Sequence, residues 1–159
     1  MIPRYTNPEM GRVWSDQRKY ETWLQVELAS VDALVEEGIV PAADAKELRA
    51  KANFSVERID EIEKVTQHDV IAFTTAVAEC VGPEARWLHF GMTSSDVLDT
   101  TLAVQMKEAT AMLLADVDRV RAAVRKRAFE HRLTPMIGRS HGIHAEPVTF
   151  GLKIGRAHV

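Results

Sequence analysis

The longest uninterrupted pattern in the sequence runs from Ser95 to Glu130 and reads SDVLDTTLAVQMKEATAMLLADVDRVRAAVRKRAFE. Its apolar side chains recur at steps of three or four residues, with no proline or glycine between them: Leu98, Leu102, Met106, Ala109, Leu113, Val117, Val120 and Val124. This spacing is typical of one face of a helix. Such a helix would contain about 36 residues and measure about 54 Å, whereas an average helix has about 11–12 residues. Because a small domain cannot cover so long a face, we predict a long helical bundle, formed between chains.

The patterns elsewhere predict an all-α fold class. Four shorter helices are expected before the long one: between Ser15 and Gly38, over residues 42–52, from Ser55 to Glu63, and from Asp69 to Cys80. Signals for β-strands are almost absent, apart from a short extended piece at Met136-Ile137. We therefore expect an N-terminal helical domain over residues 1–93, followed by the start of a central helical-bundle domain over residues 94–153.

The composition excludes several classes of protein. Of the 159 residues, 46% are hydrophobic and 27% are charged, as in a globular domain rather than a disordered one. The formal net charge of −3 argues against non-specific binding to nucleic acid. We expect no membrane span and no secretion signal, because the longest apolar run is 111–115 and residues 1–5 have no apolar core. The single cysteine, Cys80, is interpreted as a core residue, and it suits a reducing cytoplasm.

Residues 131–147 interrupt the helical pattern with histidines, glycines and prolines, and we expect a loop there. His141 and His144, with Glu146 nearby, could ligate a metal, but no third ligand is set by the spacing. Acid–base chemistry is the stronger interpretation, because imidazole titrates near neutral pH. A structural histidine in a loop is the alternative. Pro147 is expected to begin a further helix.

The segment from Gly91 to Asp96, GMTSSD, precedes the long helix. Its simplest role is to cap the helix, because hydroxyl and carboxylate oxygens accept hydrogen bonds from the free N–H groups. The same N–H groups, the hydroxyls and the positive end of the helix also suit a carboxylate or a phosphate. Capping and anion binding are compatible, since one hydroxyl can cap while another binds.

Two further groups of polar residues are candidates for ligand contacts. Thr66-Gln67-His68-Asp69 lies at a predicted helix start, where Asp69 could cap and the positive helix end would favour a neutral His68. A solvent-exposed cap is the alternative. His89 is a separate candidate. Arg4-Tyr5 combines a cation with an aromatic ring, which suits a phosphorylated ligand that carries a ring.

Several of these motifs resemble one enzyme family. Residues 91–100, GMTSSDVLDT, are similar to the first signature of the fumarase/aspartase superfamily. Residues 138–151, GRSHGIHAEPVTFG, resemble its second region in the form used by the adenylosuccinate lyase family. Arg4-Tyr5 with the following segment to Trp14, and residues 66–70, also resemble that family. The resemblance runs from residue 1 to about residue 153.

The resemblance implies a β-elimination. Fumarate would leave adenylosuccinate, giving AMP, and also leave the succinylated aminoimidazole carboxamide ribotide, an earlier intermediate of purine synthesis. A base removes a proton beside a carboxylate, and an acid protonates the leaving nitrogen. By resemblance, His141 is this general acid. No cofactor and no metal is implied, and the ligand is a small-molecule nucleotide rather than nucleic acid or a membrane.

The same resemblance implies a set of substrate-binding residues: Arg4, Tyr5, Gln67, His68, Asp69, His89, Thr93 and Ser94. Arg4 and Tyr5 would bind the nucleotide portion, and the helix start at Thr93 and Ser94 would hold the carboxylate of the carbanion. Position 67 is often arginine in the family and is glutamine here, so its role is expected to be smaller.

The sequence departs from the family in one major respect. The family's catalytic base is a serine on a mobile loop with the pattern Ser-Ser-x-Met-Pro-x-Lys-x-Asn-Pro, and this pattern does not occur in the 159 residues. The family's active sites are assembled from several subunits of a homotetramer. We therefore expect this chain to be roughly the N-terminal third of an enzyme and to be inactive alone.

Two alternatives to an enzyme remain at this stage: a non-catalytic helical interaction module and a metal-binding helical protein. The last residues, 154–159, are expected to be a non-native tail, because the family continues with an apolar helix and IGRAHV matches a translation of sequencing-adapter DNA. A divergent but genuine helical segment is the alternative. His158 is accordingly left out of the candidate site.

Overall fold

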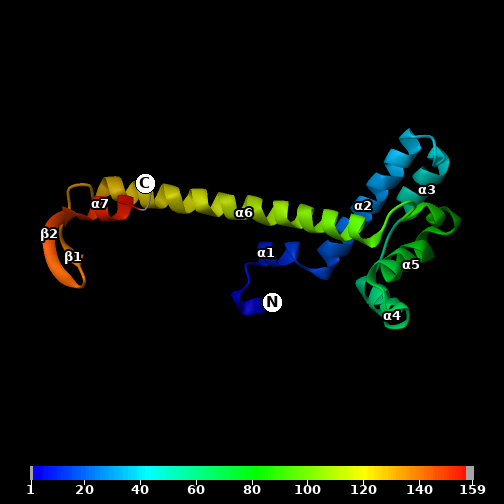
Figure 1. The fold of residues 1–159 in the computed structure, drawn as a ribbon, viewed down its shortest axis with the longest axis horizontal. Helices are drawn as coiled ribbons and strands as arrows, with labels where there is room; N and C mark the ends of the chain where they lie inside the picture. The colour runs from blue at the N-terminus through cyan, green and yellow to red at the C-terminus, as the bar shows by residue number, and fades with distance from the viewer. Residues whose placement is uncertain (1, 157–159) are drawn as a thin grey trace. The chain divides into compact units, whose positions relative to one another are not determined.

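The structure, a computed structural model, describes residues 2–156, which form two units, one up to Ala109 and one from Thr110 (Figure 1). The first unit contains these elements: the 3₁₀ helix η1 (Pro3–Tyr5), α1 (Pro8–Val13), α2 (Asp16–Glu36), α3 (Ala42–Lys51), α4 (Val56–Thr66), α5 (Asp69–Val81) and the 3₁₀ helix η2 (Pro83–Trp87). The long helix α6 (Ser94–Glu130) begins in the first unit and continues in the second. The all-α prediction is confirmed, although α1 and η2 were not anticipated.

Helix boundaries follow the capping signals in the sequence. The Ser15 and Ser55 hydroxyls accept hydrogen bonds from backbone N–H groups three residues later, which satisfies free donors at the starts of α2 and α4. Gly38 follows α2 with a φ of 72°, a conformation that glycine adopts without steric cost. The predicted start and end of α6 agree with the structure to within one residue.

The core of the first unit is an aromatic cluster between α2 and α5. Tyr20 stacks on Phe73 with ring centroids 5.8 Å apart, and Trp23 meets the edge of Phe73 at 5.4 Å. Trp23 and Phe73 are fully buried, together with Leu48 of α3 and Ile59 of α4. Aromatic pairs of this kind contribute about 0.5–1.5 kcal/mol each beyond the burial of their area. The cluster therefore holds α2 rigidly in the unit that carries most of the candidate residues.

The interpretation of Cys80 as a core residue is wrong, because its side chain is exposed. It lies in the last turn of α5, where Val81 is buried against the core and Cys80 is left uncovered. A periodic pattern gives the face of a helix but not how far the neighbouring elements extend along it.

The second unit contains a β-hairpin that the sequence patterns did not predict as such. Strands β1 (Pro135–Ser140) and β2 (Ile143–Thr149) pair antiparallel, with a register shift between Ile137 and Arg139. His141 and Gly142 form the connection with φ values of 51° and 76°. Two-residue connections with positive φ match the right-handed twist of paired strands, so this turn closes the hairpin.

The prediction that Pro147 begins a helix is wrong. Pro147 pairs with Ile137 inside β2, where a two-stranded sheet leaves an edge that tolerates proline. The last helix, α7 (Phe150–Gly155), begins after Thr149, whose hydroxyl accepts from the Leu152 N–H at 3.2 Å. No helix among the described residues is long and apolar enough to cross a membrane.

α7 packs very closely on the end of α6. The Gly151 N–H donates to the His131 carbonyl at 2.9 Å, and the Phe150 N–H donates to the Thr134 carbonyl at 2.8 Å. A Cβ atom at position 151 would lie only 2.3 Å from the Ala128 carbonyl oxygen. Glycine at this position is therefore what allows the hairpin and α7 to return onto α6.

Most of the apolar stripe of α6 is exposed. The large hydrophobic side chains of the helix that are exposed are Leu102, Met106, Leu113, Leu114, Val117, Val120 and Phe129. This exposure agrees with the expectation that one chain cannot bury the stripe, while the bundle that would cover it stays a prediction. The proposed boundary at residue 93 and the non-native tail also stay predictions, and residues 157–159 of that tail lie outside the described residues.

Candidate functional site

His89 lies between η2 and α6 and is held by a buried carboxylate. The Glu27 side chain, from α2, is completely buried. Its Oε2 accepts from the His89 backbone N–H at 2.6 Å, and its Oε1 lies 2.7 Å from His89 Nδ1. The His89 side chain keeps a quarter of its surface exposed. The pair thus consists of a buried carboxylate and an imidazole that solvent can reach.

The contact between Glu27 and His89 offsets two unfavourable free-energy terms, the burial of a carboxylate and a strained backbone conformation. A buried carboxylate without hydrogen-bond partners is strongly unfavourable, and here both oxygens of Glu27 are engaged. His89 also has a φ of 59°, which for a residue with a Cβ costs on the order of 1–3 kcal/mol. The bond from the His89 N–H to Glu27 stabilises that conformation. Residues in such strained conformations cluster at active sites and ligand-binding sites.

Glu27 was missed by reasoning from the sequence. It occupies the buried face of α2 with Tyr20, Trp23 and Val31, at steps of three and four residues. A charged residue in the middle of an apolar stripe was the available signal, because glutamate is almost never fully buried unless it is paired.

A second carboxylate holds the segment just before His89. Asp44 of α3 accepts a hydrogen bond from Trp87 Nε1 at 2.9 Å and a further bond from the Arg86 guanidinium. The Trp87 ring also meets the edge of Phe90, with centroids 5.4 Å apart. The chain on either side of His89 is therefore fixed by contacts that do not involve its own ring.

The junction of α4 and α5 carries three candidates. Gln67 ends α4 in a left-handed conformation with a φ of 48°. His68, rather than Asp69, is the N-cap of α5, because its Nδ1 accepts from the Ile71 N–H at 3.3 Å. Asp69 Oδ1 accepts from the Val70 N–H at 2.8 Å. With Nδ1 acting as an acceptor, a neutral His68 carries its proton on Nε2 and can donate it to a ligand.

Thr93 and Ser94 lie at the start of α6. The Thr93 N–H donates to the Asp96 carboxylate at 2.8 Å, so Asp96 provides the capping contact. Within the described residues, neither hydroxyl makes a hydrogen bond. Both hydroxyls are thus available at the positive end of the helix, where a carboxylate would be favoured.

Arg4 and Tyr5 lie in η1, and both are exposed. The Arg4 guanidinium carbon stands 4.7 Å from the centroid of the Tyr5 ring, within the range of a cation–π interaction. In the described part of the chain, neither side chain makes a hydrogen bond or an ion pair with another predicted site residue.

His141 is exposed in the two-residue turn of the β-hairpin. It belongs to the second unit, whereas Arg4, Tyr5 and the other six predicted binding residues belong to the first. On the same hairpin, Arg139 Nη2 lies 3.3 Å from His144 Nε2. Among residues 2–156, no group of three or more histidine, cysteine or acidic side chains is arranged to hold a metal ion.

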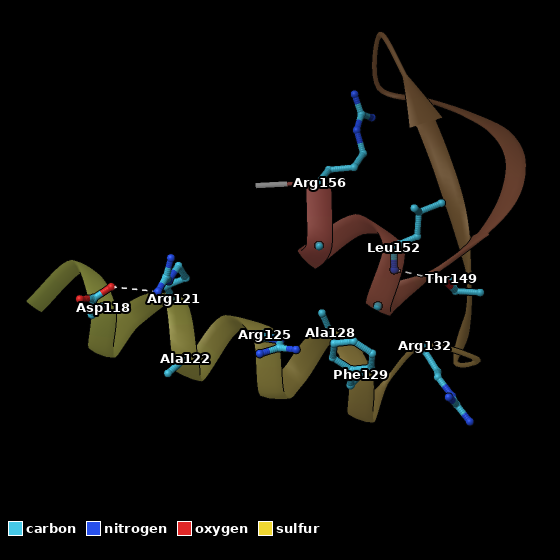
Figure 2. A pocket seen from close by; sticks show the side chains of 12 residues that line it. Asp118, Arg121, Ala122, Arg125, Ala128, Phe129, Arg132, Thr149, Leu152 and Arg156 are labelled. Atoms are coloured by element: carbon cyan, nitrogen blue, oxygen red, sulfur yellow. Dashed lines mark hydrogen bonds and ion pairs between the residues drawn. The ribbon is translucent and has the colours of Figure 1, made fainter. Parts of the chain in front are cut away.

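A groove in the second unit is separate from these residues. It has a volume of about 1010 Å³ and lies between the last turns of α6 and α7 (Figure 2). Figure 2 shows Phe129 and Leu152 on its walls, with Arg121, Arg125 and Arg156 around it. Among the described residues that line it, there is no predicted site residue and no histidine or cysteine, so we assign it no chemistry.

Comparison with known proteins identifies the family. A family model described as lyase matches residues 4–159. The chain belongs to this lyase family. Its curated relatives include the adenylosuccinate lyase of Bacillus subtilis (strain 168), 48% identical over 158 residues, which are 99% of this chain and 37% of the relative. The adenylosuccinate lyase of Synechocystis sp. is 51% identical over 154 residues, 97% of this chain and 36% of the relative.

Solved structures of this lyase fold are also similar. A fumarate lyase from Mesorhizobium sp. BNC1 has a TM-score of 0.89 at 28% identity, over 94% of this chain and 36% of that structure. A 3-carboxy-cis,cis-muconate lactonizing enzyme from Pseudomonas putida has a TM-score of 0.85 at 26% identity, over 96% of this chain and 36% of that structure. The chain therefore spans little more than a third of the length of the proteins it matches, and the resemblance to adenylosuccinate lyases is confirmed.

Proposed function

We propose that the complete lyase eliminates fumarate from adenylosuccinate, giving AMP, and from the succinylated aminoimidazole carboxamide ribotide, giving the free carboxamide. The observation that carries this proposal is the identity of 48–51% with relatives named adenylosuccinate lyase, over nearly the whole chain. The muconate enzyme shares the fold at only 26% identity, so it supports the architecture more than the substrate.

In this reaction, His141 protonates the nitrogen that leaves as fumarate forms. An imidazole titrates near neutral pH and can both hold and give up a proton there. Its exposed place in a tight hairpin turn supports the role, because the ring is accessible to a substrate held elsewhere. The base that removes the proton from carbon is expected from a part of the enzyme outside these residues.

The start of α6 is proposed to hold the carboxylate beside the carbanion. As the proton leaves carbon, negative charge develops on this carboxylate, and fixed donors stabilise it. The hydroxyls of Thr93 and Ser94 and the free N–H groups of the first turn supply such donors. Asp96 already occupies the Thr93 N–H, which leaves the hydroxyls for the ligand.

The remaining candidates are proposed to bind the rest of the substrate. His68 donates from Nε2, and Asp69 and Gln67 lie beside it at the same junction. His89 presents its partly exposed ring, while Arg4 and Tyr5 bind the nucleotide portion through charge and stacking. Arg4 and Tyr5 are freely accessible for this role in the described chain.

We also propose that the complete enzyme is a homotetramer in the cytoplasm and that the 159-residue chain alone is inactive. The exposed apolar stripe of α6 supports assembly, since an uncovered patch of this kind is typical of an interaction surface. The same stripe would suit a non-catalytic interaction module, and turnover distinguishes the two.

The test is fumarate release from adenylosuccinate by the complete protein. We expect His141→Gln to reduce the rate by about 10²–10⁴-fold, the usual contribution of general acid catalysis. His131→Gln, in the same unit and outside the motif, is the matched control and should retain activity. No fumarate release by the wild-type protein would refute the proposed reaction, and a His141→Gln variant at the parent rate would refute the assigned acid.

A further inference from the structure

The contact between Glu27 and His89 joins residues 62 positions apart in the chain. Glu27 is fully buried and, among the described residues, makes two hydrogen-bond contacts, both with His89, one to the backbone N–H and one to Nδ1. This carboxylate has no place in the proposed reaction. The burial of Glu27 and its two short contacts serve a single partner, His89, whose backbone is in the left-handed conformation.

We infer that Glu27 is a positioning residue for His89: it keeps a proton on Nδ1 and leaves Nε2 as the ring atom that meets the substrate. The inference rests on the proposed function only for the substrate contact of His89. Glu27 itself touches neither substrate nor reacting atoms and acts through the histidine.

The hydrogen bonds of the Glu27 carboxylate set both the tautomer and the orientation of the His89 ring. An ionised carboxylate only accepts hydrogen bonds, so the short contact of Oε1 requires a proton on Nδ1. The other oxygen accepts from the backbone N–H, which ties the position of the ring to the position of its own backbone. Nε2 makes no hydrogen bond to any described residue. The ring is thus fixed in both orientation and tautomer before a ligand arrives.

His68 provides a contrast within the same unit. Its Nδ1 accepts a hydrogen bond from the Ile71 N–H, so its neutral ring carries the proton on Nε2. The two histidines are therefore expected to have opposite proton positions. That difference gives an internal reference for any measurement of the tautomer.

Glu27→Gln separates positioning from packing. The amide keeps the size of the side chain, and its oxygen can still accept from the His89 backbone N–H. Its NH₂ group, however, donates to Nδ1 and moves the ring proton to Nε2. Asp44→Asn is the matched control, because Asp44 accepts hydrogen bonds from Arg86 and Trp87 of the same segment and makes none with His89 in the described structure.

The experiment is solid-state NMR of the complete protein labelled with ¹⁵N-histidine, with His89 assigned from the signals lost in His89→Gln. We expect Nδ1 of His89 to be protonated in the wild type and in Asp44→Asn, and to lose its proton in Glu27→Gln. A wild-type His89 protonated on Nε2 alone would overturn the inference, and this measurement requires no variant of Glu27 to fold.

Kinetics provide the second measurement. Glu27→Gln should lower kcat/KM for adenylosuccinate by about 10–100-fold, the range seen when partners that orient metal-ligating histidines are removed. Asp44→Asn should change it much less. A changed tautomer with unchanged kcat/KM would overturn the positioning role. A wild-type protein that releases no fumarate would instead refute the proposed function, while the tautomer measurement would still decide the contact with Glu27.

Discussion

Replacing Gly151 by alanine tests the close return of α7 onto α6. The added Cβ would lie 2.3 Å from the Ala128 carbonyl oxygen and 2.6 Å from the Arg132 Cα. Both neighbours are backbone atoms, so no side chain can rotate away to make room. α7 must therefore move outward, together with the hairpin that leads into it.

The size of the effect follows from these contacts. Overpacking of this kind costs about 1–3 kcal/mol, and the displaced N–H groups of Phe150 and Gly151 put two hydrogen bonds of about 0.5–1.5 kcal/mol each at risk. Alanine recovers about 1 kcal/mol of helix propensity. We expect the local opening free energy of this junction to fall by about 2 kcal/mol, which corresponds to about 30-fold faster amide exchange.

Hydrogen exchange of the Phe150 and Gly151 amides measures this change, in the 159-residue chain kept at a concentration low enough to limit its association. Gly155→Ala is the matched control, because its Cβ would meet only the Ala128 Cβ at an ordinary 3.8 Å. That variant should exchange at the parent rate or more slowly. Equal exchange rates in the two variants would show that the Gly151 contact does not determine the packing of α7.

Three further predictions concern binding, pH and association. Ser94→Ala in the complete protein should weaken fumarate and substrate binding, measured by calorimetry, and unchanged affinity would return Ser94 to a purely structural role. The hydrogen bond from Arg18 lowers the pKa of Glu108. The contribution of this pair to the free energy of unfolding should therefore be fully present above about pH 5, and it should be lost as the pH falls through the lowered pKa. Urea unfolding of Glu108→Gln should lack this dependence, and identical pH profiles would contradict it. The isolated 159-residue chain should release no fumarate and should aggregate in sedimentation through the exposed stripe of α6, whereas turnover or a compact monomer would oppose this expectation.

Local signals in the sequence were enough to predict most of the helices. Ser15, Ser55 and Gly38 act on donors, acceptors and φ angles within a few residues of themselves, so their effect can be read from the chain alone. The apolar stripe of α6 could also be recognised from the sequence, because its spacing repeats over the whole helix. The hairpin was not, since His141-Gly142 is an uncommon form of the two-residue turn and the strands on either side are short.

Some residues of the candidate site could be recognised from the sequence and others could not. The motifs around His68, Thr93 and His141 were visible because each is a short run of polar residues, although their roles stay predictions. Glu27 was not visible as part of a site, because its partner lies 62 residues away and only the packing of α2 beside the loop before α6 brings them together. The sequence alone determined where most of the helices begin and which residues could carry chemistry, since these depend on near neighbours. The tertiary structure decided which carboxylate is buried against which imidazole, because burial depends on the whole set of elements around it.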